Sequence, residues 1–173
     1  MLHPTARLTL AAAALACAAP AAHAQVYTNG TATATFLVTL NVLANCSISA
    51  APLAFGTAGT LSSPVQGQTT LTVRCTNSTP YNVGLDAGTV TGSTVANRLL
   101  AGTATGNTAT TVAYQLYQEA GRTTIWGNTQ GTNTVGGVGN GTAQTLNVYG
   151  QVATQTAPSP DTYQSTVTAT VYF

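Results

Sequence analysis

Hydrophobic and polar residues alternate in short stretches along most of the chain. A repeat of two puts successive side chains on opposite faces, which is typical of a β-strand with one face in a core. Turn-forming residues separate the stretches, and none of them has the repeat of a helix. The pattern predicts one antiparallel β-sandwich domain, with strands in residues 35–42, 68–75, 80–88, 111–121, 123–128, 144–152 and 165–173.

Two stretches, residues 88–97 and 127–142, are rich in Gly, Asn and Thr and are predicted to be loops. The second contains "GGVGNGT" at 136–142, but it lacks the Lys-Ser/Thr of a phosphate-binding loop and precedes no helix. We therefore assign it no ligand.

The N-terminus has the pattern of a secretory signal peptide. An apolar run over residues 8–19 is followed by the small-residue motif "AHA", which predicts cleavage before Gln25. Pro20 and His23 interrupt a run that is already short for a membrane-spanning helix. We expect an exported mature chain, residues 25–173, that is not inserted in a membrane.

The mature chain carries few charges. It has no lysine, and both histidines, His3 and His23, belong to the expected signal peptide. The remaining charges balance to zero, which leaves no basic patch for nucleic acid or an anionic membrane. They are Arg74, Arg98, Arg122, Asp86, Glu119 and Asp161.

Two cysteines, Cys46 and Cys75, remain after the expected cleavage. A single pair in an exported chain predicts a disulfide, here between the first strand of the sandwich and the second. Zinc would need more ligands, and a redox pair normally has the CxxC spacing.

Catalytic groups are nearly absent. Without histidine, lysine or a free thiol, Ser-His-Asp, Cys-His and Schiff-base chemistry are excluded. Asp86, in "LDAG", lacks the second carboxylate of an aspartic protease, and Glu119 and Asp161 lie in turn-like settings. We expect no catalytic residue, no metal site and no cofactor, and therefore no enzyme.

Aromatic side chains offer one other candidate, a platform for stacking a sugar. Tyr81 and Tyr114 lie in the inward register of their strands and are assigned to the core. Trp126, Tyr117 and Tyr149 are expected on the surface, so a carbohydrate-binding role stays open as the less favoured interpretation.

Five elements, taken in order, resemble the spore coat protein U domain family, the domain of Csu-type pilus subunits from archaic chaperone–usher systems. Together they span nearly the whole mature chain, and the fourth and fifth are the most specific. The elements are "TFLVTLNVLANCSI" (35–48), "LAFGT" (53–57), "LTVRCTN" (71–77), "VAYQLYQEAGRTTIW" (112–126) and "YQSTVTATVYF" (163–173).

The resemblance implies an all-β fold, an incomplete immunoglobulin-like antiparallel β-sandwich that lacks its last strand and is completed by a donor strand. It divides the chain into a signal peptide (1–24), a donor-strand segment (25–44) and the sandwich domain (45–173). A periplasmic chaperone would first fill the resulting groove by lending a strand. The groove-lining strand would present Val167, Ala169, Val171 and Phe173.

The resemblance also implies that the N-terminal segment acts in trans, with Leu37 breaking its alternation. At an outer-membrane usher, this segment would replace the chaperone's strand in another copy or a homologous pilin. The fibre would form on the surface of a Gram-negative bacterium and support adhesion and biofilm formation. The donor face would consist of Phe36, Val38, Leu40 and Val42.

Two alternatives remain open at this point. One is a spore-coat or cell-surface matrix protein built on the same sandwich. The other is a carbohydrate-binding adhesin, although a tip adhesin would carry an extra N-terminal domain for which the mature chain leaves no room.

Overall fold

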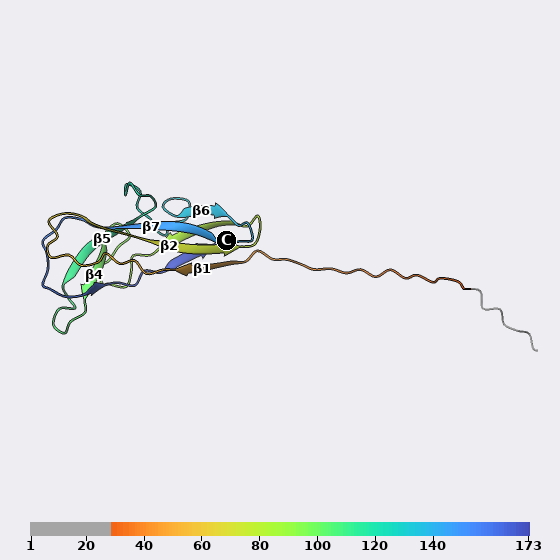
Figure 1. The fold of residues 1–173 in the computed structure, drawn as a ribbon, viewed down its shortest axis with the longest axis horizontal. Helices are drawn as coiled ribbons and strands as arrows, with labels where there is room; N and C mark the ends of the chain where they lie inside the picture. The colour runs from red at the N-terminus through yellow and green to blue at the C-terminus, as the bar shows by residue number, and fades with distance from the viewer. Residues whose placement is uncertain (1–28) are drawn as a thin grey trace, which may run out of the picture. The chain divides into compact units, whose positions relative to one another are not determined.

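The computed structural model describes residues 29–173, which form nine β-strands (Figure 1). The expected signal peptide, residues 1–24, and residues 25–28 of the donor-strand segment lie outside the described part. No helix among residues 29–173 is long and apolar enough to cross a membrane. The strands are β1 (Cys46–Ala50), β2 (Val65–Cys75), β3 (Pro80–Leu85), β4 (Arg98–Gly102), β5 (Thr111–Tyr117), β6 (Val135–Val138), β7 (Gln144–Val152), β8 (Tyr163–Gln164) and β9 (Ala169–Tyr172).

The chain divides into two units between Thr39 and Leu40, and all nine strands lie in the second unit, residues 40–173, called the body here. The strands of the body form two antiparallel sheets. The large sheet has the order β1-β2-β7-β5-β4-β8, and the small sheet has the order β6-β3-β9. The longest ladder joins β2 to β7, which lie side by side in Figure 1. The all-β antiparallel fold expected from the sequence is confirmed.

The core lies between the two sheets and is formed by the inward positions of the alternating strands. Tyr81 and Tyr114 are buried, as their register predicts. Trp126 was expected on the surface, and this expectation is wrong: the side chain is 1% exposed, and its Nε1–H donates a hydrogen bond to the carbonyl of Val83 at 2.8 Å. Burial of a ring this large makes Trp126 a central packing residue rather than a sugar platform.

Within residues 123–142 the structure departs from the predicted strands at two places, and a glycine explains one of them. Residues 127–142 were predicted to be a loop, yet β6 forms there and pairs with β3. A Cβ atom at Gly137 would lie 2.5 Å from the Tyr81 ring, so β6 can pack here only because residue 137 has no side chain. The predicted strand at 123–128 does not form; an isolated bridge links Ile125 to Tyr117, and the Trp126 N–H donates to the Leu116 carbonyl (2.9 Å).

A glycine pair also lets the chain after β1 cover the end of the large sheet. Gly67 of β2 and Gly150 of β7 are register partners. A Cβ atom at Gly150 would lie 2.6 Å from the Leu53 side chain and 2.9 Å from the Phe55 ring. Phe55 in turn meets Tyr114 edge-to-face, with ring centroids 6.1 Å apart. The "LAFGT" element therefore extends the core.

Arg98, the first residue of β4, is fully buried and ties the two sheets together. Its Nε donates to the carbonyl of Asp86 (2.8 Å), and its Nη2 donates to the carbonyls of Leu85 (2.9 Å) and Trp126 (2.7 Å). Its Nη1 donates to Oε1 of Gln115 (2.5 Å) and to the carbonyl of Val95 (3.3 Å). Burial lowers the pKa of the guanidinium, but these neutral oxygens satisfy its donors and offset the loss of hydration.

We predict that Arg98→Met lowers the free energy of unfolding by about 3 kcal/mol or more, because each buried carbonyl left without a donor costs about 1–3 kcal/mol. Arg74→Met is the matched control, since Arg74 is exposed and its side chain donates one hydrogen bond, to the Gly141 carbonyl. It should change stability by less than about 0.5 kcal/mol. Urea denaturation followed by Trp126 fluorescence measures both, and equal midpoints for the two variants would contradict the role of Arg98.

Candidate strand-binding site

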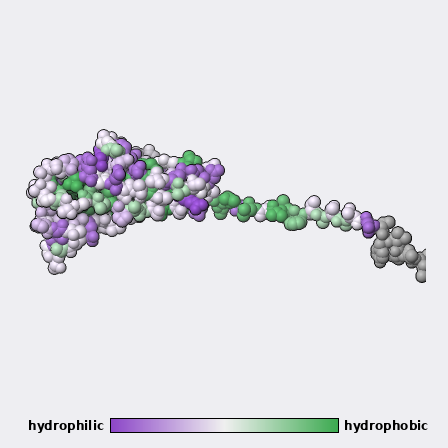
Figure 2. Space-filling view, viewed as in Figure 1, coloured by the Kyte–Doolittle hydropathy of each residue, from purple (hydrophilic) through white to green (hydrophobic). Residues whose placement is uncertain are grey.

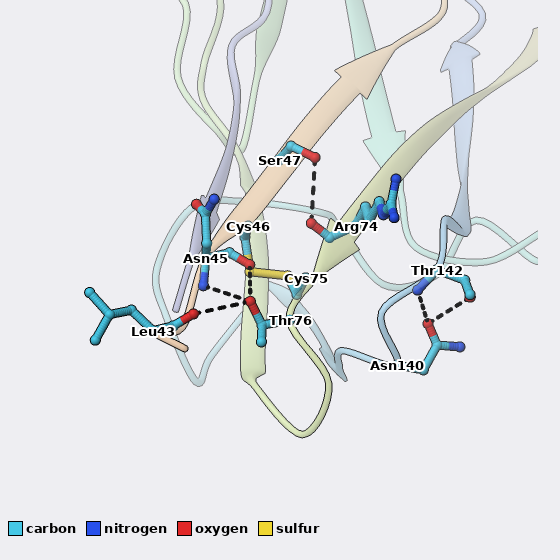
Figure 3. The surroundings of a disulfide bond; sticks show 9 residues. All are labelled: Leu43, Asn45, Cys46, Ser47, Arg74, Cys75, Thr76, Asn140 and Thr142. Atoms are coloured by element: carbon cyan, nitrogen blue, oxygen red, sulfur yellow. Dashed lines mark hydrogen bonds between the residues drawn. A yellow bond between two sulfur atoms is a disulfide. The ribbon is translucent and has the colours of Figure 1, made fainter. Parts of the chain in front are cut away.

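A disulfide fixes β1 to the large sheet. Cys46, its first residue, is bonded to Cys75, 29 positions later, and the two are register partners in the β1–β2 ladder. Figure 3 shows the disulfide at the start of β1, with the Ser47 hydroxyl donating to the Arg74 carbonyl (3.4 Å). Closing a loop of this length stabilises the fold by about 3–4 kcal/mol through chain entropy. The lone cysteine pair thus anchors an edge strand.

β9 is held at the edge of the small sheet by its ladder with β3 and by one aspartate. The Asp86 N–H donates to the carbonyl of Thr168 (3.1 Å), and Oδ1 of Asp86 accepts the Thr168 N–H (2.9 Å). The same oxygen accepts the Gly88 N–H (2.8 Å). Asp86 is therefore a turn residue that places the start of β9, with no second carboxylate of a protease beside it.

β1 and β9 are terminal strands of their sheets, and each has hydrogen-bonded partners on one side only. β1 pairs only with β2, and β9 pairs only with β3. The two strands lie close together in the body, but no ladder joins them. Their free edges define the candidate site, called the β1–β9 edges below.

Side chains on the inner faces of these two strands are less buried than their direct partners. Ile48 of β1 and Val171 of β9 are only half buried, although both pack against the core. Their partners one strand further in, Val73 and Val83, are 0% exposed. The inner-face side chains are therefore incompletely buried at the β1–β9 edges.

The four residues predicted to line a groove in the last strand occupy two kinds of environment. Val167, Ala169 and Val171 are half buried and pack against the core, and the threonines between them are exposed. Phe173 keeps the same register but is 60% exposed. The alternation of half-buried and exposed residues runs from Ser165 to Val171 and then stops, because Tyr172 is half buried and Phe173 is exposed.

The N-terminal segment is described from residue 29 and forms no strand before Cys46. Its apolar side chains are unusually exposed for their size, at 72% or more, and they account for the green atoms of the segment in Figure 2. They include the whole predicted donor face and also Leu37 and Leu43. The exposed fractions are Phe36 86%, Leu37 88%, Val38 78%, Leu40 86%, Val42 72% and Leu43 80%.

The other two carboxylates are turn residues. Oε1 of Glu119 accepts hydrogen bonds from the Thr123 hydroxyl and N–H and from the Thr124 N–H, and these bonds lower the pKa of Glu119. Asp161 accepts from the Asn107 amide and the Ala104 N–H, which likewise lower its pKa. Within residues 29–173, no group of three or more His, Cys, Asp or Glu side chains could hold a metal.

The remaining aromatic candidates, Tyr117 and Tyr149, are cross-strand partners on β5 and β7. Both are half buried, and the Arg122 guanidinium lies 5.8 Å from the centroid of the Tyr149 ring. The Arg122 Nε also donates to the Gly150 carbonyl (3.2 Å). An arginine therefore already stacks on one of the two rings, and Trp126 is in the core, so none of the three residues considered for a sugar platform is fully exposed.

The family model of the Spore Coat Protein U domain matches residues 32–170. The chain belongs to this family. The match includes the predicted donor face, both cysteines and the first two residues of β9, so the family pattern covers the exposed segment as well as the sandwich. No curated protein matches the chain significantly.

Among solved structures, this Spore Coat Protein U domain chain is similar to a chain of the CsuC–CsuE chaperone–tip adhesion subunit pre-assembly complex from the archaic chaperone–usher Csu pili of Acinetobacter baumannii. The identity is 27% and the TM-score is 0.52. The match covers 76% of this chain but only 40% of the other. It supports an immunoglobulin-like pilus-subunit fold.

Residues that place the β1–β9 edges were mostly invisible to sequence reasoning. The sequence shows that Asp86 lacks the second carboxylate of a protease and that Arg98 is one of a few charges, but it does not show what either side chain binds. Their roles depend on backbone carbonyls and N–H groups that sequence patterns do not reveal. One signal was present, because an arginine next to "LLAG" in a nearly uncharged chain is an unusual choice.

We predict that Val171→Asp abolishes recovery of soluble folded protein, because a carboxylate beside buried Val83 loses its hydration without gaining a partner, at a cost of several kcal/mol. Thr170→Asp, one position away on the exposed face, is the control and should be recovered normally. The measurement is the amount of soluble protein after export to a bacterial periplasm. Normal recovery of Val171→Asp would show that this face is not part of a buried surface.

The lowered pKa values of Glu119 and Asp161 predict a loss of stability in acid. A folded-state pKa below the unfolded value contributes stability that is fully present above the unfolded pKa, near pH 4, and lost as the pH falls through the folded value. The melting temperature should therefore decline below about pH 4. The Glu119→Gln/Asp161→Asn double variant should show a shallower decline, and identical slopes would contradict the assignment.

Proposed function

We propose that this chain is a structural pilin of a chaperone–usher fimbria that polymerises by donor-strand exchange. The observation that carries the proposal is that one chain contains both strand edges without partners and an exposed segment with the pattern of a strand. Ile48 and Val171 are half covered at strand edges without partners, and a separate stretch of residues exposes a matching row of apolar side chains. Membership of the Spore Coat Protein U domain family and similarity to a chain from Csu pili support it.

The donor would be the segment containing Phe36, Val38, Leu40 and Val42, inserted between β1 and β9 of a neighbouring copy or homologous pilin. Strand addition would give the free edges main-chain hydrogen bonds, and the alternating side chains would cover the half-buried inner faces. Burying four such side chains would contribute on the order of 6–12 kcal/mol before ordering costs. That is enough to stabilise a fibre without charge complementarity.

Before polymerisation, the same edges would need a temporary strand, because unpaired edges beside apolar surface lead to aggregation. A periplasmic chaperone would supply that strand, and an outer-membrane usher would catalyse the exchange. The product would be a fimbria on the surface of a Gram-negative bacterium that supports adhesion and biofilm formation. The subunit needs no catalytic residue, cofactor or metal for this role.

We predict that Leu40→Asp folds with its chaperone but does not polymerise. The substitution puts a carboxylate on the donor face, where a neighbour would have to bury it, and it leaves the β1–β9 edges of its own chain unchanged. Asn41→Asp is the matched control, because Asn41 lies on the opposite side of the alternation, and it should form normal fibres. Electron microscopy and heat-resistant ladders on denaturing gels provide the measurements.

Two results would reject the proposal. Normal fibres from Leu40→Asp would show that this segment is not the donor. Failure of Leu40→Asp to fold with the chaperone present would show that the segment belongs to the chain's own core. Microscopy of cells expressing the wild type with its chaperone and usher separates a fibre from the alternative, an amorphous surface coat.

A further inference from the structure

The three residues before β1 are held by a single threonine just beyond β2. The Thr76 N–H donates to the carbonyl of Asn45 (2.9 Å), and the Asn45 N–H donates to Oγ1 of Thr76 (3.1 Å). The Thr76 hydroxyl lies 3.3 Å from both the Leu43 carbonyl and the Asn45 carbonyl, so its one proton is shared between them. Figure 3 shows these contacts beside the disulfide.

These contacts continue the β1–β2 ladder past the end of β2. Cys46 pairs with Cys75, so the next pair in this register is Asn45 with Thr76. Both the N–H and the carbonyl of Asn45 are hydrogen-bonded to Thr76. Leu43, two residues earlier, points its carbonyl to the same side, as in an extended strand. The Thr76 hydroxyl therefore stands in for a backbone group that β2 no longer supplies.

An extended path over residues 43–45 has a consequence for the donor segment, given the proposed function. Only three residues separate Val42 from Cys46, so the donor face could reach the free edge of its own β1 only through a tight reversal within residues 43–45. That reversal would break the Thr76 contacts to Leu43 and Asn45. A chain that filled its own site in this way would be closed as a monomer.

We propose that Thr76 is a positioning residue that keeps residues 43–45 extended, so that the donor segment is offered to another subunit and not to its own β1–β9 edges. The disulfide fixes Cys46, and Thr76 holds the backbone of residues 43–45 within the body. Leu43 is 80% exposed and Thr76 is only half buried, so the hydroxyl acts at the surface and is not needed for core packing.

The test compares Thr76→Val, which keeps the shape and loses the hydroxyl, with Thr76→Ser, which keeps the hydroxyl. Hydrogen–deuterium exchange with mass spectrometry is measured on residues 36–42 of the monomer, separated from fibres by gel filtration. In wild type and Thr76→Ser these amides should exchange without protection. In Thr76→Val the fraction of monomers in which these amides are protected should increase about tenfold, which is the effect of losing one to two hydrogen bonds. The fibre yield should fall correspondingly.

A second variant keeps Thr76 intact. Inserting Gly-Gly between Leu43 and Ala44 leaves the Asn45–Thr76 bonds in place but frees Leu43 and adds length for the reversal. It should also increase the protected monomer, and it decides the matter if Thr76→Val does not fold. Unprotected monomers from both variants, or reduced fibre yield without protection, would overturn the proposal.

A failure of the proposed donor-strand exchange can be distinguished from a failure of the Thr76 proposal. In that case Leu40→Asp would form normal fibres whatever Thr76 does. The exchange measurement on monomers reports only whether the segment folds back on its own chain, so it gives its answer without polymerisation.

Discussion

A β-strand in a folded protein needs hydrogen-bond partners for its backbone and cover for its apolar face, and β1 and β9 each have these on one side only. The best-held features of the body serve these two strands. The Cys46–Cys75 disulfide fixes the start of β1, and Asp86 fixes the start of β9. Arg98 binds the carbonyls of Leu85 and Asp86, at the end of the strand on which β9 pairs. The open edges are thus rigidly placed although they are incomplete.

This rigidity is achieved almost without ion pairs. Arg98 is held by oxygens of neutral groups, and Glu119 and Asp161 bind hydroxyl, amide and N–H groups within turns. Hydrogen bonds of this kind are screened far less by salt than surface ion pairs are. For a chain expected to work outside the cell, where ionic strength varies, a covalent crosslink and neutral hydrogen bonds are a robust choice.

Sequence periodicity predicted the strands that have one buried face and missed those whose formation depends on a neighbour. The inward sets of β2 and β7 follow the alternation closely, and Val73 and Val148 are buried as it requires. The predicted strands did not include β1, β4, β6 or β8. "RLLAG" does not alternate, and "VGGV" has turn composition, yet each has a ladder available from an adjacent strand. Strand formation at such sites is decided by tertiary contacts rather than by local propensity.

The dependence on tertiary contacts also explains why the sequence did not reveal the burial of one aromatic residue, Trp126, and one charged residue, Arg98. Trp126 lies within the predicted strand at 123–128, which does not form, so the pattern gave no information about which side its ring faces. It is buried because its ring fills the space beside Val83 and its N–H reaches a carbonyl there. Arg98 is buried for a related reason, since only a planar group with several donors can satisfy carbonyls from β3 and from the Trp126 segment together.

The two apolar rows of the proposed strand-binding site can be seen in the sequence alone, because each is a local pattern and the two have equal length. Residues 36–42 and 167–173 each present four apolar side chains at every second position over seven residues, about 20 Å of extended chain. In the structure, each row has uncovered members, and Phe173 at 60% exposure is the most exposed of the second row. Neither row could cover the other by a change of side-chain rotamer alone, because the missing element is a backbone with its own N–H and C=O groups. What the β1–β9 edges need is a strand, and an exposed stretch of chain with strand periodicity is the form in which a second subunit could supply it.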